Sequence, residues 1–217
     1  MVDYTRPPKP PAAPAGGVSL SKVTLTKGSP SVSLTKGQGA GGQMRINLNW
    51  NSGAQKRGLF SKTPAVDLDL ACLWETTDGR KGVVQALGNS FGSLDQPPYV
   101  LLDGDDRSGK VSSGENLLVN LDRLDAIKRI LVFAFIYEGA PNWAAADAVV
   151  TLFPQGAAPI EVRLDEHATN ARSCAIALLT NSGGALTVQR EIRYLPGVQR
   201  DLDAAYGWGM NWTAGRK

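Results

Sequence analysis

Short runs in which apolar and polar residues alternate constrain the fold of this 217-residue chain more than any other feature. Val and Leu alternate with Ser, Thr and Lys in the tandem repeats VSLSK (18–22), VTLTK (23–27) and VSLTK (32–36). The run MRINLNW (44–50) continues the same alternation. Because a period of two places all apolar side chains on one face of a strand, these runs predict strands that each bury one face.

Further segments have the composition of strands and are separated by turn residues. They are residues 66–74, 83–87, 98–102, 116–121, 129–137, 147–153, 159–164, 172–180 and 185–193. Two short segments, 121–129 and 201–206, are compatible with helix. Many short strands without long helical patterns between them predict an all-β fold, an antiparallel β-sandwich with one or two short helices.

A glycine-rich stretch before residue 44 matches the pattern GxGxxG at Gly37, Gly39 and Gly42. A dinucleotide-binding fingerprint requires a helix to begin there, because the helix N-terminus holds the pyrophosphate. A strand-like run follows instead, so we interpret this stretch as a hairpin loop.

The first 17 residues, MVDYTRPPKPPAAPAGG, contain five prolines and no apolar period. This composition predicts a disordered Pro-rich tail (1–17) before a single domain (18–217). The PxxP spacings of the tail leave a docking ligand as an alternative to a plain linker. With no apolar leader segment and no run of about 18 apolar residues, we expect a cytoplasmic protein without direct membrane insertion.

Charge is unevenly distributed along the chain. Residues 1–64 contain nine Lys and Arg against one acid, whereas residues 65–115 contain nine acids against four bases. The cations of the first block are singly spaced and have no aromatic residues between them. We therefore interpret them as solubilising charge on the sheets and expect no nucleic-acid partner.

Residue patterns that support catalysis are missing from the sequence. It contains no GxSxG, HExxH or GxxxxGK[ST] motif. The single histidine, His167, lies in the polar run DEHATN, where we expect a surface side chain. Cys72 and Cys174 lie far apart in the sequence, which excludes a disulfide framework and a cysteine-based zinc site. Each lies in an apolar run, so we expect both side chains to be buried. We therefore expect no catalytic activity, with a metal-dependent hydrolase as the enzymatic alternative.

The carboxylates are more informative. Asp67 and Asp69 stand at i and i+2 in VDLDL, so both project from one face of the predicted strand, roughly 7 Å apart. Leu68 and Leu70 take the other face. Like charges on one face repel each other, which favours a cation between them.

A second acidic cluster is the loop DGDDRSG, with Asp103, Asp105 and Asp106, followed by Gly114 and Glu115. Carboxylate and carbonyl oxygens on flexible backbone suit Ca²⁺, which takes about six to eight oxygen ligands. Mg²⁺ is less suited because no phosphate site accompanies these residues. The sequence therefore predicts a Ca²⁺ site formed by residues Asp67, Asp69, Asp103, Asp105, Asp106, Gly114 and Glu115.

An EF-hand does not explain this cluster. With Asp103 as the first ligand, the sixth position is Ser108 where glycine is required, and the twelfth is Gly114 where glutamate is required. Ca²⁺ would then bind between loops that are distant in sequence. The alternative is that these residues are solvated turn aspartates, which β-turns favour.

At these residues the chain resembles the tellurium-resistance TerD-domain family, and is most similar to its TerA-like members. The resemblance extends over about residues 18–195 and rests on the stretches VSLSK, VSLTKG, NLNW, AVDLDLACLW, LDGDDRSG, SGENLLVNLDRL and ILVFAFIYEG. It implies a Ca²⁺-binding β-sandwich without known catalytic activity, which acts in bacterial tellurite resistance and stress responses. It also implies partners, namely other proteins of the family and a membrane protein of the same gene cluster.

The family's metal ligands correspond here to Asp67, Asp69, Asp105, Asp106 and Glu115. Two departures remove negative charge: the GDxDDE-like run is VSSGE (111–115), and the Trp-Asp turn is Trp50–Asn51. These losses imply that one of the family's two calcium sites is weak or absent.

The acidic turn after the long apolar strand remains as Glu138, with Asn142 and Asp147 as accessory candidates. The expected function is a calcium-binding stress-response protein that acts by binding. The alternative is an adaptor that recruits partners through the Pro-rich arm and the aromatics Tyr206, Trp208 and Trp212. Those aromatics have a simpler interpretation as a cover over the end of the sandwich.

Overall fold

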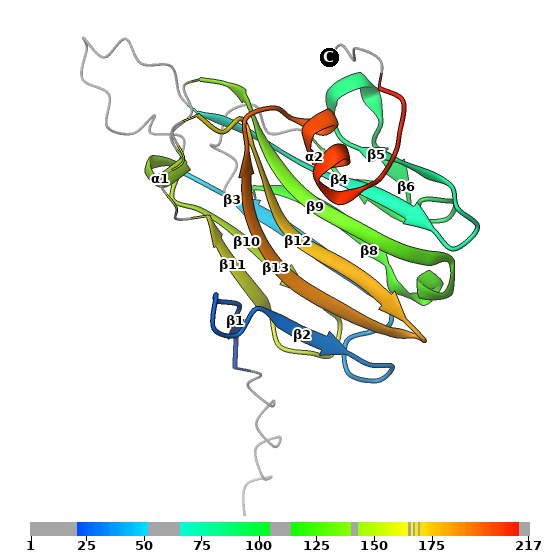
Figure 1. Cartoon of the computed structure of the whole chain (residues 1–217). Helices are drawn as coiled ribbons and strands as arrows, with labels where there is room; N and C mark the ends of the chain where they lie inside the picture. Colours follow the sequence, from blue (N-terminus) through cyan, green and yellow to red (C-terminus); the bar gives the residue numbers. More distant parts are fainter. Residues whose placement is uncertain are drawn as a thin grey trace, which may run out of the picture.

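The chain forms two β-sheets that pack face to face (Figure 1). The computed structural model describes residues 21–51, 66–104, 114–139, 143–164, 166, 168 and 170–212. The first sheet has the strand order β1 (Val23–Thr24), β11 (Ile160–Leu164), β10 (Ala148–Phe153), β3 (Gln43–Asn49), β8 (Glu115–Asn120), β7 (Val100–Leu102) and β6 (Gly92–Ser93). The second has the order β2 (Ser31–Leu34), β13 (Ala185–Leu195), β12 (Ser173–Ser182), β9 (Ile127–Glu138), β4 (Asp67–Thr76) and β5 (Lys81–Val84).

This architecture confirms the predicted all-β sandwich. Nearly all neighbouring strands are antiparallel, and the exception is β1, which pairs with β11 in parallel. The expected strand 23–27 is shorter than predicted, because after Leu25 the chain turns, with Thr26 N–H donating to the carbonyl of Ser29. The predicted tail, residues 1–17, lies outside the described residues.

The glycine-rich stretch is a loop, as its sequence context predicts. Gly37, Gly39 and Gly42 all have positive φ, and β3 begins at the next residue, Gln43. A strand therefore starts where a nucleotide-binding helix would have to start.

The main core lies between the two sheets. Alternate residues of each strand enter it, such as Met44, Ile46 and Leu48 of β3. On β4, Leu68 and Leu70 belong to this core. The residues adjacent to them in sequence therefore face away from it, onto the outer face of the second sheet.

A second apolar layer covers that outer face. The helix α2 (Gln199–Tyr206) and the chain after it lie across the strands of the second sheet (Figure 1). Leu202 and Trp208 pack there against Ala71, Leu73 and Phe133. Since both faces of the second sheet are covered, β4 and β9 are buried almost continuously rather than at alternate positions.

Helices are few and short in the described chain. α1 (Trp143–Ala146) has four residues and α2 has eight, and neither approaches the length needed to cross a bilayer. The segment expected to be helical, 121–129, is a 3-10 helix, η3 (Leu121–Ala126), and a further 3-10 turn, η2, spans Leu87–Asn89. η3 ends where β9 begins, because Ile127 pairs with Thr76 of β4.

Candidate functional site

Two buried aspartates mark the start of β4. Asp67 and Asp69 lie on the outer-face side of this strand, and only 1% of Asp69 is exposed. Placing both carboxylates away from water carries a large desolvation cost, which opposite charge or hydrogen bonds must offset. The sequence had predicted their common face correctly.

A third carboxylate lies beside them on the neighbouring strand. A β-bulge shifts the register of β4 against β9 and places Glu138 directly opposite Asp67. Glu138 is exposed. Directly opposed like charges destabilise a sheet, so a nearby cation would stabilise the ends of β4 and β9.

Glu115 reaches this region from the other sheet. It is the first residue of β8, where it pairs with Leu48, and only 2% of it is exposed. Its Oε2 accepts a hydrogen bond of 2.6 Å from the backbone N–H of Leu70, next to Asp69. β5 pairs with β4 only at Cys72–Glu75, so the carboxylate of Glu115 occupies a part of the β4 edge that no strand of the described chain covers.

The position of Glu115 depends on the glycine before it. Gly114 has φ +62°, and a Cβ there would lie 2.1 Å from the carbonyl oxygen of Leu48. Only glycine combines this backbone conformation with so close an approach. Gly114 therefore serves the turn that delivers Glu115, a role that does not depend on its carbonyl as a ligand.

Amide side chains surround the same turn. Asn47 donates to the side-chain oxygen of Asn116 at 2.9 Å and to the carbonyl of Glu115 at 3.3 Å. Arg45 donates to the same oxygen of Asn116 at 3.1 Å. The alternation in MRINLNW predicts an outward face for Asn47, but it does not indicate which strand lies opposite.

Of the predicted ligands in the loop DGDDRSG, only Asp103 belongs to the described residues. Asp103 is exposed, and its N–H donates to the carbonyl of Asn116, so the loop starts beside the strand that carries Glu115. Asp105 and Asp106 lie outside the described residues. Within the described part of the chain, no three His, Cys, Asp or Glu side chains converge closely enough to hold a metal ion.

The turn at Trp50–Asn51 also comes to the start of β4. The indole N–H of Trp50 donates to the carbonyl of Val66, the residue before Asp67, at 3.1 Å. The backbone N–H of Asn51 donates to the carbonyl of Ala146. Of the accessory candidates, Asp147 is exposed in the turn after α1, and Asn142 lies outside the described residues.

The donor set fits a hard divalent cation. The described groups near the start of β4 include carboxylates from both sheets, whose oxygens Ca²⁺ prefers and a soft metal does not. Burial of the Asp69 and Glu115 carboxyl groups carries a desolvation cost that a bound cation would offset.

The cysteines offer no comparable chemistry. Cys72 and Cys174 are both buried. Burial raises the pKa of Cys72 to about 12, and burial likewise raises the pKa of Cys174. Because the thiolate is the reactive form, both side chains are inert in the folded protein. The histidine, His167, lies outside the described residues.

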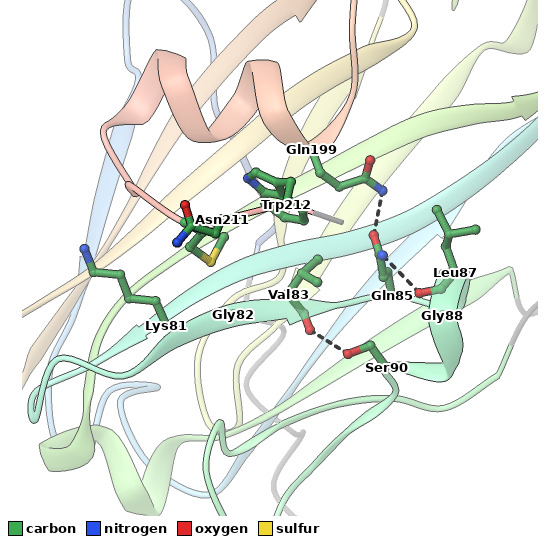
Figure 2. A pocket seen from close by; sticks show the side chains of 11 residues that line it. Lys81, Gly82, Val83, Gln85, Leu87, Gly88, Ser90, Gln199, Asn211 and Trp212 are labelled. Carbon is green, nitrogen blue, oxygen red and sulfur yellow. Dashed lines mark hydrogen bonds between the residues drawn. The ribbon is translucent and has the colours of Figure 1, made fainter. Parts of the chain in front are cut away.

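A hollow of about 480 Å³ lies between β5, α2 and the C-terminal segment. Figure 2 shows the side chains around it, where Gln199 donates to Gln85 at 2.6 Å and Gln85 donates to the carbonyl of Leu87 at 3.0 Å. Trp212 is half-buried in this lining, and its indole N–H donates to Asp203 at 3.0 Å. Trp208, by contrast, is fully buried as part of the outer layer, so it covers the second sheet and does not line the hollow.

Comparisons with known proteins agree with this architecture. No protein-family model matches the sequence. The tellurium resistance protein TerA of Alcaligenes sp is 46% identical over 204 residues, which are 92% of this chain and 60% of that protein. The chain therefore spans about 60% of the length of this relative.

Two solved structures share the fold. A homologue of the telluride resistance protein TerD, SCO6318 from Streptomyces coelicolor A3(2), has a TM-score of 0.57 and 20% identity, covering 78% of this chain and 99% of that one. A protein of unknown function, SAV2460, has a TM-score of 0.58 and 16% identity, covering 79% and 99%. At such low identity the likeness concerns the fold alone.

Proposed function

Because this chain belongs to the TerD-like tellurium resistance family, we propose that it is a cytoplasmic stress-response protein that acts by binding Ca²⁺ rather than by catalysis. The observation that carries the proposal is the contact of Glu115 on the first sheet with Leu70 N–H on the second, next to buried Asp69. This contact brings carboxylates from two distant parts of the sequence to one edge of the sandwich.

Ca²⁺ would offset the repulsion among these groups. Asp67, Asp69 and Glu115 are its ligands in this proposal, with Asp103, Asp105 and Asp106 contributed by the following loop. The ion would link the two sheets at the edge that β5 leaves open, and it would hold the loop that begins at Asp103. Binding in this sense controls the shape of a surface, which is how the protein would engage other tellurium-resistance proteins and a membrane partner.

The proposal is tested on chelator-treated protein by titration calorimetry and thermal unfolding with CaCl₂. A ligand at 100 times its Kd stabilises the folded state by about 2.7 kcal/mol. For a chain of this size that corresponds to a rise in Tm of roughly 5–11 °C. MgCl₂ at the same concentration should give a smaller rise, because Mg²⁺ demands stricter geometry.

A matched pair of substitutions distinguishes loss of the calcium site from the general effect of removing one negative charge. Asp69→Asn should abolish the calcium-induced rise in Tm, whereas Asp125→Asn, at an exposed position of η3, should retain it. If wild-type protein shows neither heat nor a Tm rise at millimolar Ca²⁺, or if Asp69→Asn retains both, the proposal is wrong.

An adaptor function is the second candidate, and the hollow beside Trp212 favours it. Asp203 fixes the indole of Trp212 by a hydrogen bond, and neighbouring amides of Gln85 and Gln199 offer polar contacts to a partner. Oriented aromatic side chains of this kind are typical of interaction hot spots. Trp212→Ala should then weaken co-purification with a co-expressed tellurium-resistance protein without changing calcium binding, and equal recovery with wild-type protein would remove this candidate.

A further inference from the structure

A second hollow, of about 390 Å³, lies at the other edge of the first sheet, where β1 ends. Polar side chains from separate elements line it, namely Thr24, Thr26, Lys27, Arg163, Glu166 and Arg190. Three cations and one carboxylate give this lining a net charge of +2. It shares no residue with the carboxylates at the start of β4.

Arg190 is the most informative of these residues. It lies on the same side of β13 as Val188, which belongs to the core, and only 11% of its side chain is exposed. Within the described chain its guanidinium forms one ion pair, at 3.9 Å to Glu166 Oε1, and no side-chain hydrogen bond. A guanidinium has five N–H donors, and burying them without acceptors is costly. The hollow is the space into which these donors can bind a ligand.

The other polar groups suit the same ligand. Lys27 Nζ lies 2.9 Å from the same oxygen of Glu166, so two cations converge on one anionic oxygen. Thr26 Oγ1 accepts a hydrogen bond from the N–H of Ser29, which leaves its hydroxyl hydrogen to donate. The carboxylate of Glu166 thus marks the position where Lys27 and Arg190 attract an anionic oxygen. Because this side chain is partly exposed, a bound anion can displace it.

We propose that this hollow binds a small oxyanion, with Arg190 as the principal donor and with charge supplied by Lys27 and by Arg163, which is also paired with Glu161 at 3.1 Å. A guanidinium pairs with two oxygens of one anion in fixed geometry, which distinguishes an oxyanion from chloride. Free phosphate, a phosphate monoester and tellurite share this chemistry. The inference goes beyond the calcium-binding function and does not depend on it.

Titration calorimetry of the full chain with sodium phosphate, phosphoserine and sodium tellurite, at constant ionic strength in chloride buffer, tests the proposal. We expect saturable binding of at least one of these anions, and the one bound most tightly identifies the source. Arg190→Gln should weaken binding about tenfold or more, since a charge-assisted hydrogen bond is lost. Glu166→Gln should strengthen binding, because it removes the competing carboxylate.

Lys36→Gln is the matched control, because it removes one charge at an exposed site outside the hollow and should leave binding unchanged. The double substitution of Lys27 and Arg163 by Gln changes side chains that are 79% and 51% exposed, so it preserves the fold even if Arg190→Gln does not. It should also weaken binding. No saturable heat with any anion, or equal affinity in the double variant and the Lys36 control, would overturn the proposal.

Two controls distinguish anion binding from calcium binding, namely removal of Ca²⁺ by a chelator and the Asp69→Asn variant. Both should leave the anion affinity unchanged, because the two sites share no residue. If anion binding disappears with Ca²⁺ removal, the anion is held by bound metal and the assignment to Arg190 is wrong.

Discussion

Replacing Trp208 tests whether the C-terminal segment is an integral layer of the fold. Trp208 is fully buried, and it packs against Leu73 and Phe133 on the outer face of the second sheet. Its indole N–H donates to the carbonyl of Trp74 at 3.0 Å, and the guanidinium of Arg129 lies 3.7 Å from its ring centroid.

The magnitude follows from these contacts. Truncating a buried Trp or Phe to Ala costs about 3–5 kcal/mol. The lost hydrogen bond contributes about 1 kcal/mol and the lost cation–π contact about 1 kcal/mol. Because such terms are not additive, we expect Trp208→Ala to lower the free energy of unfolding by about 4–5 kcal/mol. Trp208→Phe retains most of the buried ring and should cost about 1–2 kcal/mol.

Urea unfolding followed by far-UV circular dichroism measures both variants, because this signal does not depend on the number of tryptophans. Trp208→Ala should shift the midpoint with an unchanged m-value if the layer unfolds together with the sheets. A cost below about 1 kcal/mol would refute the reasoning, since a fully packed indole cannot be removed so cheaply.

Three further predictions concern charge, thiols and a turn. Burial raises the pKa of Glu75, but hydrogen bonds and charges from Lys128 and Arg129 outweigh it and hold the pKa below its usual value, so Glu75 stabilises the fold above its unfolded pKa. Urea unfolding should show wild-type stability falling from about pH 5 towards pH 3, with a shallower fall in Glu75→Gln, and parallel curves would contradict this. Since burial raises the pKa of Cys72 to about 12, very little of this thiol is ionised at pH 8. Neither cysteine should react with a thiol reagent until urea unfolds the chain, and rapid labelling of native protein would show the burial to be wrong. Gly114→Ala should cost clearly more stability than the about 1 kcal/mol expected for Gly37→Ala, where φ is also positive but nothing lies within 4 Å of the added Cβ. If urea unfolding shows equal losses of stability for the two variants, residue 114 does not lie as close to the carbonyl of Leu48 as the structure has it.

The sequence predicted the strands well because their alternation is local. It predicted less well where distant residues decide the structure. Residues 121–129 have good helix formers, yet Ile127 pairs with Thr76 and extends β9, so pairing with β4 overrides the local preference. The continuous burial of β4 depends on Trp208, which lies 134 residues from Trp74.

The candidate site was predictable only in part, for the same reason. The i, i+2 spacing placed Asp67 and Asp69 on one face without any knowledge of the fold. The contact of Glu115 with Leu70 joins residues 45 positions apart on different sheets, and no spacing rule indicates it. The sequence likewise does not indicate a site at Arg190, because nothing in it shows that Arg190 and Lys27 lie near the same carboxylate, that of Glu166.

The pairing of β2 with β13 has a consequence for how this protein is made. Ser33 lies opposite Thr187, so one border of the second sheet closes only when a segment 154 residues further along has left the ribosome. At about 5–20 residues per second, translation takes roughly 8–30 s to supply it. During that interval Leu34, which is buried in the core of the folded protein, has no partner strand, so the nascent chain exposes an apolar, unpaired strand of the kind that promotes aggregation.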